Sequence, residues 1–356
     1  MTTPSTWERV ADLPLRVDGY DLEGHAFAVS PEFVRRTTDI RLHGDGELGI
    51  GEDVVYDAEE HERAQAAGPV HDLAGDWTLA TFCDRVESLE LFDGREPVYQ
   101  ASWEYRVWAY ESAALDLALR QAGTSLHEAL GRELHPVTFV NSLRLGEPPS
   151  FEILADRLAR YPTVRFKLDA TSSWDDALCE RLAATGAIDS IDLKGQYKGT
   201  VVDQPPDPDL YRRVVERFPG AWIEDPALTP ETEPILLPHR DRITWDAPIH
   251  GVEDVEALPF PPRMVNIKPS RSGPLRRLFA LYDHCAERGI TAYGGGQTEL
   301  SVGRGHIQLL ASMFHPHAPN DVAPSPFNER VVPDGLPASP MTCVPDRTGF
   351  RLAEAR

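Results

Sequence analysis

The sequence predicts an α/β protein in which an N-terminal α+β unit precedes a (β/α)8 barrel. Three observations support this prediction. The 356 residues exceed what one typical core accommodates, so we expect two packed domains or a barrel with an appendage. From about Pro136 onwards, short apolar segments alternate with stretches of helix length, which is typical of parallel βα units. The GxGxxG turn of open doubly wound sheets is absent.

Two segments in the first third of the chain have clear periodicity. Residues 31–52 alternate apolar and polar side chains and then contain a His-Gly-Asp-Gly turn, which predicts a β-hairpin. Residues 104–120 place apolar side chains on one helical stripe, and Gly123 follows where a helix is expected to end. We therefore expect a mixed α+β domain over residues 1–135.

Eight short apolar segments follow this unit. Eight sequential βα units indicate a closed barrel rather than an open sheet. We expect the strands at 137–143, 164–169, 188–194, 221–225, 243–247, 264–268, 290–294 and 320–323. The barrel is expected over residues 136–325, and the tail over 326–356 is expected to pack back on the first domain.

The composition disfavours several classes of protein. A formal net charge of -22 opposes binding to nucleic acid or to an anionic membrane. The four cysteines are scattered without a CxxC pair, which indicates reduced thiols rather than a disulfide framework or structural zinc. Neither a leader segment nor an apolar run of membrane-spanning length is visible, so we expect a cytoplasmic protein.

Charged residues recur near the ends of the predicted barrel strands. Asp192, Glu224 and Asp246 each alternate with apolar neighbours there, and Lys167 and Lys268 do so on flanking strands. Alternate residues of a barrel strand point inward, and functional groups collect at the carboxyl ends. Because unpaired charges are costly to bury, one shared ionic site is the economical explanation.

The residue types in this site favour metal-assisted proton transfer. Three acids from successive strands offer the hard oxygen ligands that Mg²⁺ prefers. A partly buried lysine beside a metal cation has a lowered pKa, so Lys167 and Lys268 are candidate acid/base residues on opposite faces of a substrate. Only four of the 35 basic residues are lysines, which draws attention to these two. Two simpler explanations stay open: independent surface carboxylates, and lysines that only form structural ion pairs.

Six segments, taken in their order along the chain, are together specific. They are TTDIRLHGDGELGIGE, AYESAALDLALRQAGTSLHEALGR, WIEDP, TWDAP, VNIKPSRSG and GGGQTELSVGR. The chain resembles the enolase superfamily through them, and within it the muconate lactonizing enzyme (muconate cycloisomerase) subgroup; it is also similar to o-succinylbenzoate synthase and dipeptide epimerase. The resemblance covers most of the chain. It implies that the first domain is a capping domain, that the cofactor is Mg²⁺ and that the substrate is a small carboxylate.

The resemblance also implies roles for individual residues. It assigns Asp192, Glu224 and Asp246 to the three metal ligands and Lys268 to the acid/base of the sixth strand. Where the third-strand ligand is usually followed two residues later by Asn, this chain has Lys194, which would neutralise a second substrate carboxylate or replace the charge of the metal.

The Lys-x-Lys motif of the second strand matches in two ways. In the preferred match, Arg165 and Lys167 occupy the two lysine positions, and Lys167 is the partner base. The other match starts at Lys167 and puts Asp169 in the place of the base. Arg165 and Asp169 are candidate substrate contacts in either case.

Two further residues match the family near the substrate pocket. Glu299, at the end of the seventh strand, corresponds to an acid there, although a helix-capping role is the alternative. Residues 17–25 correspond by position to a mobile capping loop, in which Tyr20 is the expected substrate contact.

The implied activity is Mg²⁺-dependent abstraction of a proton α to a carboxylate through an enediolate intermediate. Cycloisomerisation, racemisation or epimerisation, or dehydration would follow, so we expect an isomerase or lyase with a Lys/Lys acid–base pair. Association into a homo-oligomer is common for such barrels. The alternative is a barrel that keeps the pocket without turnover and binds a small molecule, because Lys194 or Asp169 disables the site.

Overall fold

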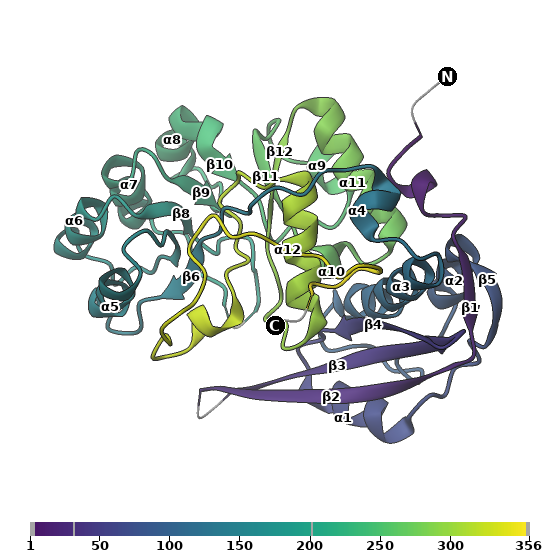
Figure 1. Cartoon of the computed structure of the whole chain (residues 1–356). Coiled ribbons are helices and arrows are strands. Elements are labelled where there is room, and N and C mark those ends of the chain that lie inside the picture. The colour runs from purple at the N-terminus through teal and green to yellow at the C-terminus, as the bar shows by residue number, and fades with distance from the viewer. Residues whose placement is uncertain (1–3, 31–32, 201, 354–356) are drawn as a thin grey trace.

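The computed structural model describes residues 4–30, 33–200 and 202–353, which form an α+β domain beside a barrel (Figure 1). The α+β domain contains a three-stranded antiparallel sheet in the order β2-β3-β4 and a two-stranded antiparallel ribbon of β1 and β5. Its strands are β1 (Pro14–Val17), β2 (Gly19–Ser30), β3 (Phe33–Gly44), β4 (Glu47–Asp53) and β5 (Gly75–Thr78). Its helices are η1 (Trp7–Arg9), α1 (Ala58–Ala67), α2 (Leu79–Glu87), α3 (Ser102–Gln121) and α4 (Leu126–Leu130).

Helix α3 is the centre of this domain. Nearly all of its residues are buried, because the sheet covers one side and the helices of the barrel cover the other. Strand β4 approaches it closely at Gly49 and Gly51, where a Cβ atom would collide with the backbone of α3. The predicted hairpin and the predicted helix over 104–120 are both confirmed.

The second unit is a ring of parallel strands surrounded by helices (Figure 1). Its strands are β6 (Asn141–Arg144), β7 (Phe166–Asp169), β8 (Ile188–Asp192), β9 (Trp222–Glu224), β10 (Ile243–Thr244), β11 (Met264–Ile267) and β12 (Thr291–Gly294). Its helices are α5 (Glu152–Arg160), α6 (Asp176–Ala184), α7 (Pro208–Arg217), α8 (Glu233–Leu236), η2 (Leu237–Arg242), α9 (Val252–Glu256), α10 (Pro269–Ser272), α11 (Leu275–Arg288), α12 (Val302–Phe314) and η3 (Ser325–Asn328).

Single bridges close this ring. Strands β6 to β10 form one parallel sheet, and β11 pairs with β12. A bridge between Trp245 and Val265 joins the two sheets. At the eighth position, Asp321 pairs with Gly295 and Asn320 pairs with Phe139, which returns to the first strand. The predicted barrel is therefore confirmed, although the eighth strand is reduced to these two bridge residues.

The C-terminal segment runs back along the barrel to helix α3. Met341 pairs with Val137 beside the first strand, and the N–H of Phe350 donates to the carboxylate of Asp116 at 2.7 Å. Arg351 lies 2.8 Å from the same carboxylate. The domain limits at residues 135 and 325 stay a prediction. Among the described residues, no helix combines the length and the apolar character needed to cross a membrane.

Candidate active site

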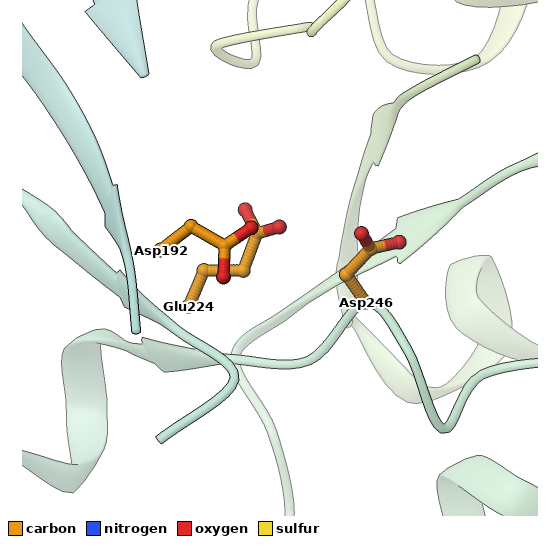
Figure 2. A group of neighbouring side chains, drawn as sticks. All are labelled: Asp192, Glu224 and Asp246. Atoms are coloured by element: carbon orange, nitrogen blue, oxygen red, sulfur yellow. The ribbon is translucent and has the colours of Figure 1, made fainter. Parts of the chain in front are cut away.

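Three carboxylates converge at the carboxyl ends of consecutive barrel strands. Asp192 is the last residue of β8, Glu224 is the last residue of β9, and Asp246 follows β10 by two residues. Figure 2 shows the three side chains as neighbours at these strand ends. One oxygen atom from each lies within 4.8 Å of the others, and all three side chains are fully buried. They come together because neighbouring parallel strands end at the same edge and their inward-facing residues point to one axis.

A fourth buried acid, Asp225, holds Asp246 in place. Its carboxylate accepts the backbone N–H groups of Asp246 and Ala247, each at 2.8 Å. Burial and the nearby charge of Asp246 raise the pKa of Asp225 to about 7. Asp225 lies in the WIEDP segment, but no sequence signal distinguished this positioning role.

Lys167 and Lys268 lie on the two flanks of the carboxylates. Lys167 donates to Glu224 and its Nζ atom lies 3.3 Å from Asp192, whereas Lys268 Nζ lies 2.9 Å from Asp246 Oδ2. Burial lowers the pKa of Lys268 against the opposing effect of the Asp246 carboxylate, and the charge of Arg271 lowers it further. Burial also acts on Lys167, but Glu224 and Asp192 outweigh it and raise the pKa of that ammonium.

Arg271 also contacts Asp246. It follows Lys268 by three residues, on α10, and its guanidinium lies 2.7 Å from Asp246 Oδ1 and 2.5 Å from the main-chain oxygen. Desolvation is outweighed by Asp246, so the pKa of Arg271 is raised further. Arg271 was not among the residues predicted from the sequence, although its position in the VNIKPSRSG segment was a signal.

Two tyrosines complete the hydrogen bonds of the acidic group. Tyr293 of β12 donates to Glu224 Oε2 at 2.6 Å, and Tyr197, in the loop after β8, donates to Asp246 Oδ2 at 2.8 Å. Tyr293 lies two residues before the bridge residue Gly295. The alternation of inward-facing and outward-facing residues along this strand could therefore have indicated it. Tyr197 lies in a loop, for which the sequence carries no comparable pattern.

The register of β7 shows which side chains of the Lys-x-Lys motif face the acidic group. Asp169 pairs with Asp192 in the neighbouring strand, and Lys167 pairs with Ser190, so both face the acidic group. Arg165 precedes the strand; its side chain is 41% exposed and its guanidinium contacts Asp189 at 2.5 Å. Arg165 thus lies away from the acidic group, and both its substrate contact and the role of Lys167 as partner base stay predictions. The segment from Lys167 to Asp169 is the one that reaches the site.

Lys194 enters the same group from the loop after β8. Its ammonium donates to Asp192 Oδ2 and lies 3.4 Å from Asp169 Oδ1. Burial is outweighed by these two carboxylates, which raise the pKa of Lys194. The two ammonium groups of Lys194 and Lys167 in turn lower the pKa of Asp192 to about 2, against the effect of burial.

Two other predicted residues lie apart from this ionic group. Glu299 is in the loop between β12 and α12, where it accepts the N–H of Gln297 at 2.5 Å and lies 3.1 Å from Arg304. Its substrate contact stays a prediction. Tyr20 is buried in β2, accepts the N–H of His71 at 3.0 Å and packs edge-on against Tyr110. The expectation of a mobile loop over 17–25 is wrong, because residues 19–30 form a strand that pairs with β3.

The acidic group has the chemistry of a divalent cation site. Asp192, Glu224 and Asp246 supply only oxygen donors, which suits a hard cation such as Mg²⁺. The hydrogen bonds from Tyr293 and Tyr197 orient Glu224 and Asp246, whose other oxygen atoms accept Lys167 and Arg271. The donor set therefore fits a divalent metal ion.

Comparison with solved structures shows the fold to which the chain is similar. The dipeptide epimerase from Methylococcus capsulatus complexed with Mg ion matches with a TM-score of 0.63 and 20% identity, over 86% of this chain and 89% of that chain. The muconate cycloisomerase from Pseudomonas fluorescens matches with a TM-score of 0.62 and 16% identity, over 87% of each chain. The protein therefore has the capped (β/α)8-barrel fold of the enolase superfamily, as the sequence resemblance implied.

Sequence comparison identifies the particular family. Residues 133–329 match the model described as domain of unknown function (DUF8230) C-terminal domain, and residues 8–129 match the corresponding N-terminal domain. The chain belongs to this DUF8230 family.

Curated relatives include o-succinylbenzoate synthases. That of Geobacillus stearothermophilus is 28% identical over 230 residues, which is 61% of this chain and 58% of the relative. That of Bacillus subtilis (strain 168) is 25% identical over 226 residues, or 60% of this chain and 58% of the relative. The chain thus spans 58% of the length of the curated relatives that it matches.

Proposed function

We propose that this protein is an Mg²⁺-dependent enzyme that removes a proton α to the carboxylate of a small substrate. The observation that carries the proposal is the convergence of Asp192, Glu224 and Asp246 at consecutive strand ends, with Lys167 and Lys268 on either side. The fold shared with a dipeptide epimerase and a muconate cycloisomerase, and the similarity to o-succinylbenzoate synthases, support the same class of reaction.

In this proposal the three carboxylates bind the metal ion and the two lysines handle the proton. Asp192, Glu224 and Asp246 hold the cation, which when bound supplies an electrophile for the substrate carboxylate and stabilises the charge that develops there. Lys268 takes or returns the proton on one face of the substrate, and Lys167 provides an ammonium on the other. Cycloisomerisation, epimerisation or racemisation, and dehydration all begin with this proton transfer, and a small carboxylate is the expected partner.

A second candidate function rests on the pair formed by Asp169 and Lys194. Asp169 lies at the end of β7, where one match to the family motif expects a base. The ammonium of Lys194, which contacts Asp169, also contacts the proposed metal ligand Asp192. This arrangement favours a barrel that binds a small carboxylate without turning it over. The two candidates differ in a measurable property, since only the enzyme exchanges substrate hydrogen with solvent.

The test is solvent-deuterium exchange, followed by NMR, over a panel of N-acyl amino acids, dipeptides, muconate-type acids and succinylbenzoate-type acids. We expect exchange at the α carbon of at least one compound in the presence of Mg²⁺, and its loss on treatment with EDTA. The Lys268→Ala variant should lose exchange by about two to four orders of magnitude.

Lys198→Ala is the matched control, because Lys198 is an exposed lysine of the loop that contains Lys194. Exchange that persists when Lys167 and Lys268 are both replaced by Ala would contradict the proposal. Ligand binding by calorimetry without Mg²⁺ dependence and without exchange would favour the binding protein.

A further inference from the structure

The ammonium of Lys194 is hydrogen-bonded to Asp192 Oδ2, one of the oxygen atoms that could bind a metal ion. The backbone N–H of Lys194 donates to Asp192 Oδ1 at 2.9 Å. Lys167 lies 3.3 Å from the same Oδ2 atom. Asp192 is therefore shared by two ammonium groups before any divalent cation binds, and a metal ion must compete with one of them.

The backbone at position 194 is unfavourable for a lysine. Lys194 has φ +53°, in the left-handed region that disfavours most side chains and that Gly and Asn tolerate best. A lysine at this position therefore has a less favourable backbone conformation than Asn would have. The contacts of its ammonium with Asp192 and Asp169 offset this backbone cost.

Cations match the fully buried carboxylates of this group in number, and the partly exposed carboxylates of Asp169 and Asp321 contact Lys194 and Lys167 at 3.4 Å and 3.8 Å. The four fully buried carboxylates of the group and their four cationic neighbours among the described residues are Asp192, Glu224, Asp225, Asp246, Lys167, Lys194, Lys268 and Arg271. A divalent cation would add two positive charges to a site that is shielded from water, unless one resident cation moves away.

Lys194 is the resident cation best able to move. Its side chain is 12% exposed, whereas those of Lys167, Lys268 and Arg271 are 2%, 9% and 5% exposed. A second carboxylate, that of Asp169, already lies 3.4 Å from its ammonium and is itself 13% exposed. The ammonium can therefore leave Asp192 and keep an anionic partner at the rim of the barrel.

We propose that Lys194 competes with the divalent cation for Asp192, and that metal binding shifts its ammonium onto Asp169. This inference rests on the metal site of the proposed function and adds a built-in competitor to it. Competition by Lys194 weakens the affinity for Mg²⁺. Asp169 reduces this loss of affinity by accepting the displaced ammonium.

The experiment is calorimetric titration of the full-length protein with Mg²⁺ alone, without substrate. Lys194→Asn should lower the Kd for Mg²⁺ by about tenfold or more, because it removes a positive charge within direct contact of a ligand. Lys198→Asn removes the same charge from an exposed neighbour and should leave the Kd within about twofold of the wild-type value. Lys194→Gln, which keeps a donor near Asp192, is the second neutral variant, and Lys194→Arg should retain the weak affinity.

A double-mutant cycle tests the role of Asp169. Asp169→Asn should raise the Kd for Mg²⁺ in the wild-type background, and this effect should largely disappear when Lys194 is already Asn. Asp246→Asn should abolish binding in every background, which assigns the measured heat to this site. Thermal unfolding without metal verifies that each variant is folded.

The outcomes separate the two proposals. Equal Mg²⁺ affinity of wild type, Lys194→Asn and Lys194→Gln, with loss of binding in Asp246→Asn, would overturn the competition and leave the metal site intact. Weaker binding in both neutral variants would also overturn it, since Lys194 would then support the site. If neither the wild type nor any neutral variant binds Mg²⁺, both proposals are wrong.

Discussion

Replacing Glu111 with Gln should remove a pH-dependent loss of stability that this buried carboxyl imposes on the protein. Glu111 is fully buried on α3, and its Oε2 atom accepts the N–H of Leu275, the first residue of α11, at 2.7 Å. It therefore joins the α+β domain to the barrel. Burial, aided by the charge of Glu87, raises the pKa of Glu111 from an ordinary 4.5 to about 8.

The sign of the effect follows from proton linkage. In the folded protein Glu111 stays protonated up to about pH 8, whereas in the unfolded chain it ionises near pH 4.5. Between these values the folded state binds more protons, so the free energy of unfolding decreases as the pH rises. The difference between the two pKa values corresponds to about 5 kcal/mol at most, reached near pH 8.

Urea unfolding at pH 5, 6, 7 and 8 measures this contribution. Because Gln is neutral throughout and its carbonyl can still accept the N–H of Leu275, Glu111→Gln should become progressively more stable than the wild type, by a few kcal/mol at pH 8. Glu216→Gln, which removes the same carboxylate charge from the exposed face of α7, is the matched control. A Glu111→Gln difference that stays constant from pH 5 to pH 8 would refute the reasoning.

Two glycines give further predictions. A Cβ atom at Gly295 would lie 2.8 Å from Lys268 Cε and 2.9 Å from Asn266 Oδ1, so Gly295→Ala should displace Lys268 from Asp246 and reduce deuterium exchange by about tenfold or more, with a nearly unchanged unfolding midpoint. Unchanged exchange would show that the lysine position is not critical. A Cβ atom at Gly49 would lie 2.6 Å from the backbone nitrogen of Leu117, so Gly49→Ala should cost about 1–3 kcal/mol in urea unfolding, and an unchanged midpoint would contradict the close packing of β4 on α3.

The sequence alone was sufficient for the barrel and for the convergence of its acids. The barrel follows from apolar segments at βα spacing, which predict parallel strands. The convergence of the acids follows from their alternation with apolar neighbours, which places them on the inner face of each strand. Asp192, Glu224 and Asp246 could be selected in this way because each alternates with apolar neighbours near the end of its predicted strand.

Tertiary structure decided which polar groups complete the site. Whether Arg165 or Asp169 faces the acids depends on the pairing of β7 with β8, and a register is a relation between two strands that neither strand encodes alone. Tyr20 was assigned to a loop by its position in the family resemblance, and its actual place in a strand is set by the pairing of β2 with β3.

The ion pairs were also beyond the reach of sequence patterns. Lys194 contacts Asp192 because the backbone turns into the left-handed region after β8, and Arg271 contacts Asp246 because α10 begins directly after β11. The pattern of the chain thus indicated that Asp192, Glu224, Asp246, Lys167 and Lys268 face the barrel interior, but it did not indicate Asp225 or Arg271. The partners of these charges were decided by the fold, because Coulomb energies between buried groups depend on distances of a few ångströms that only the packed chain defines.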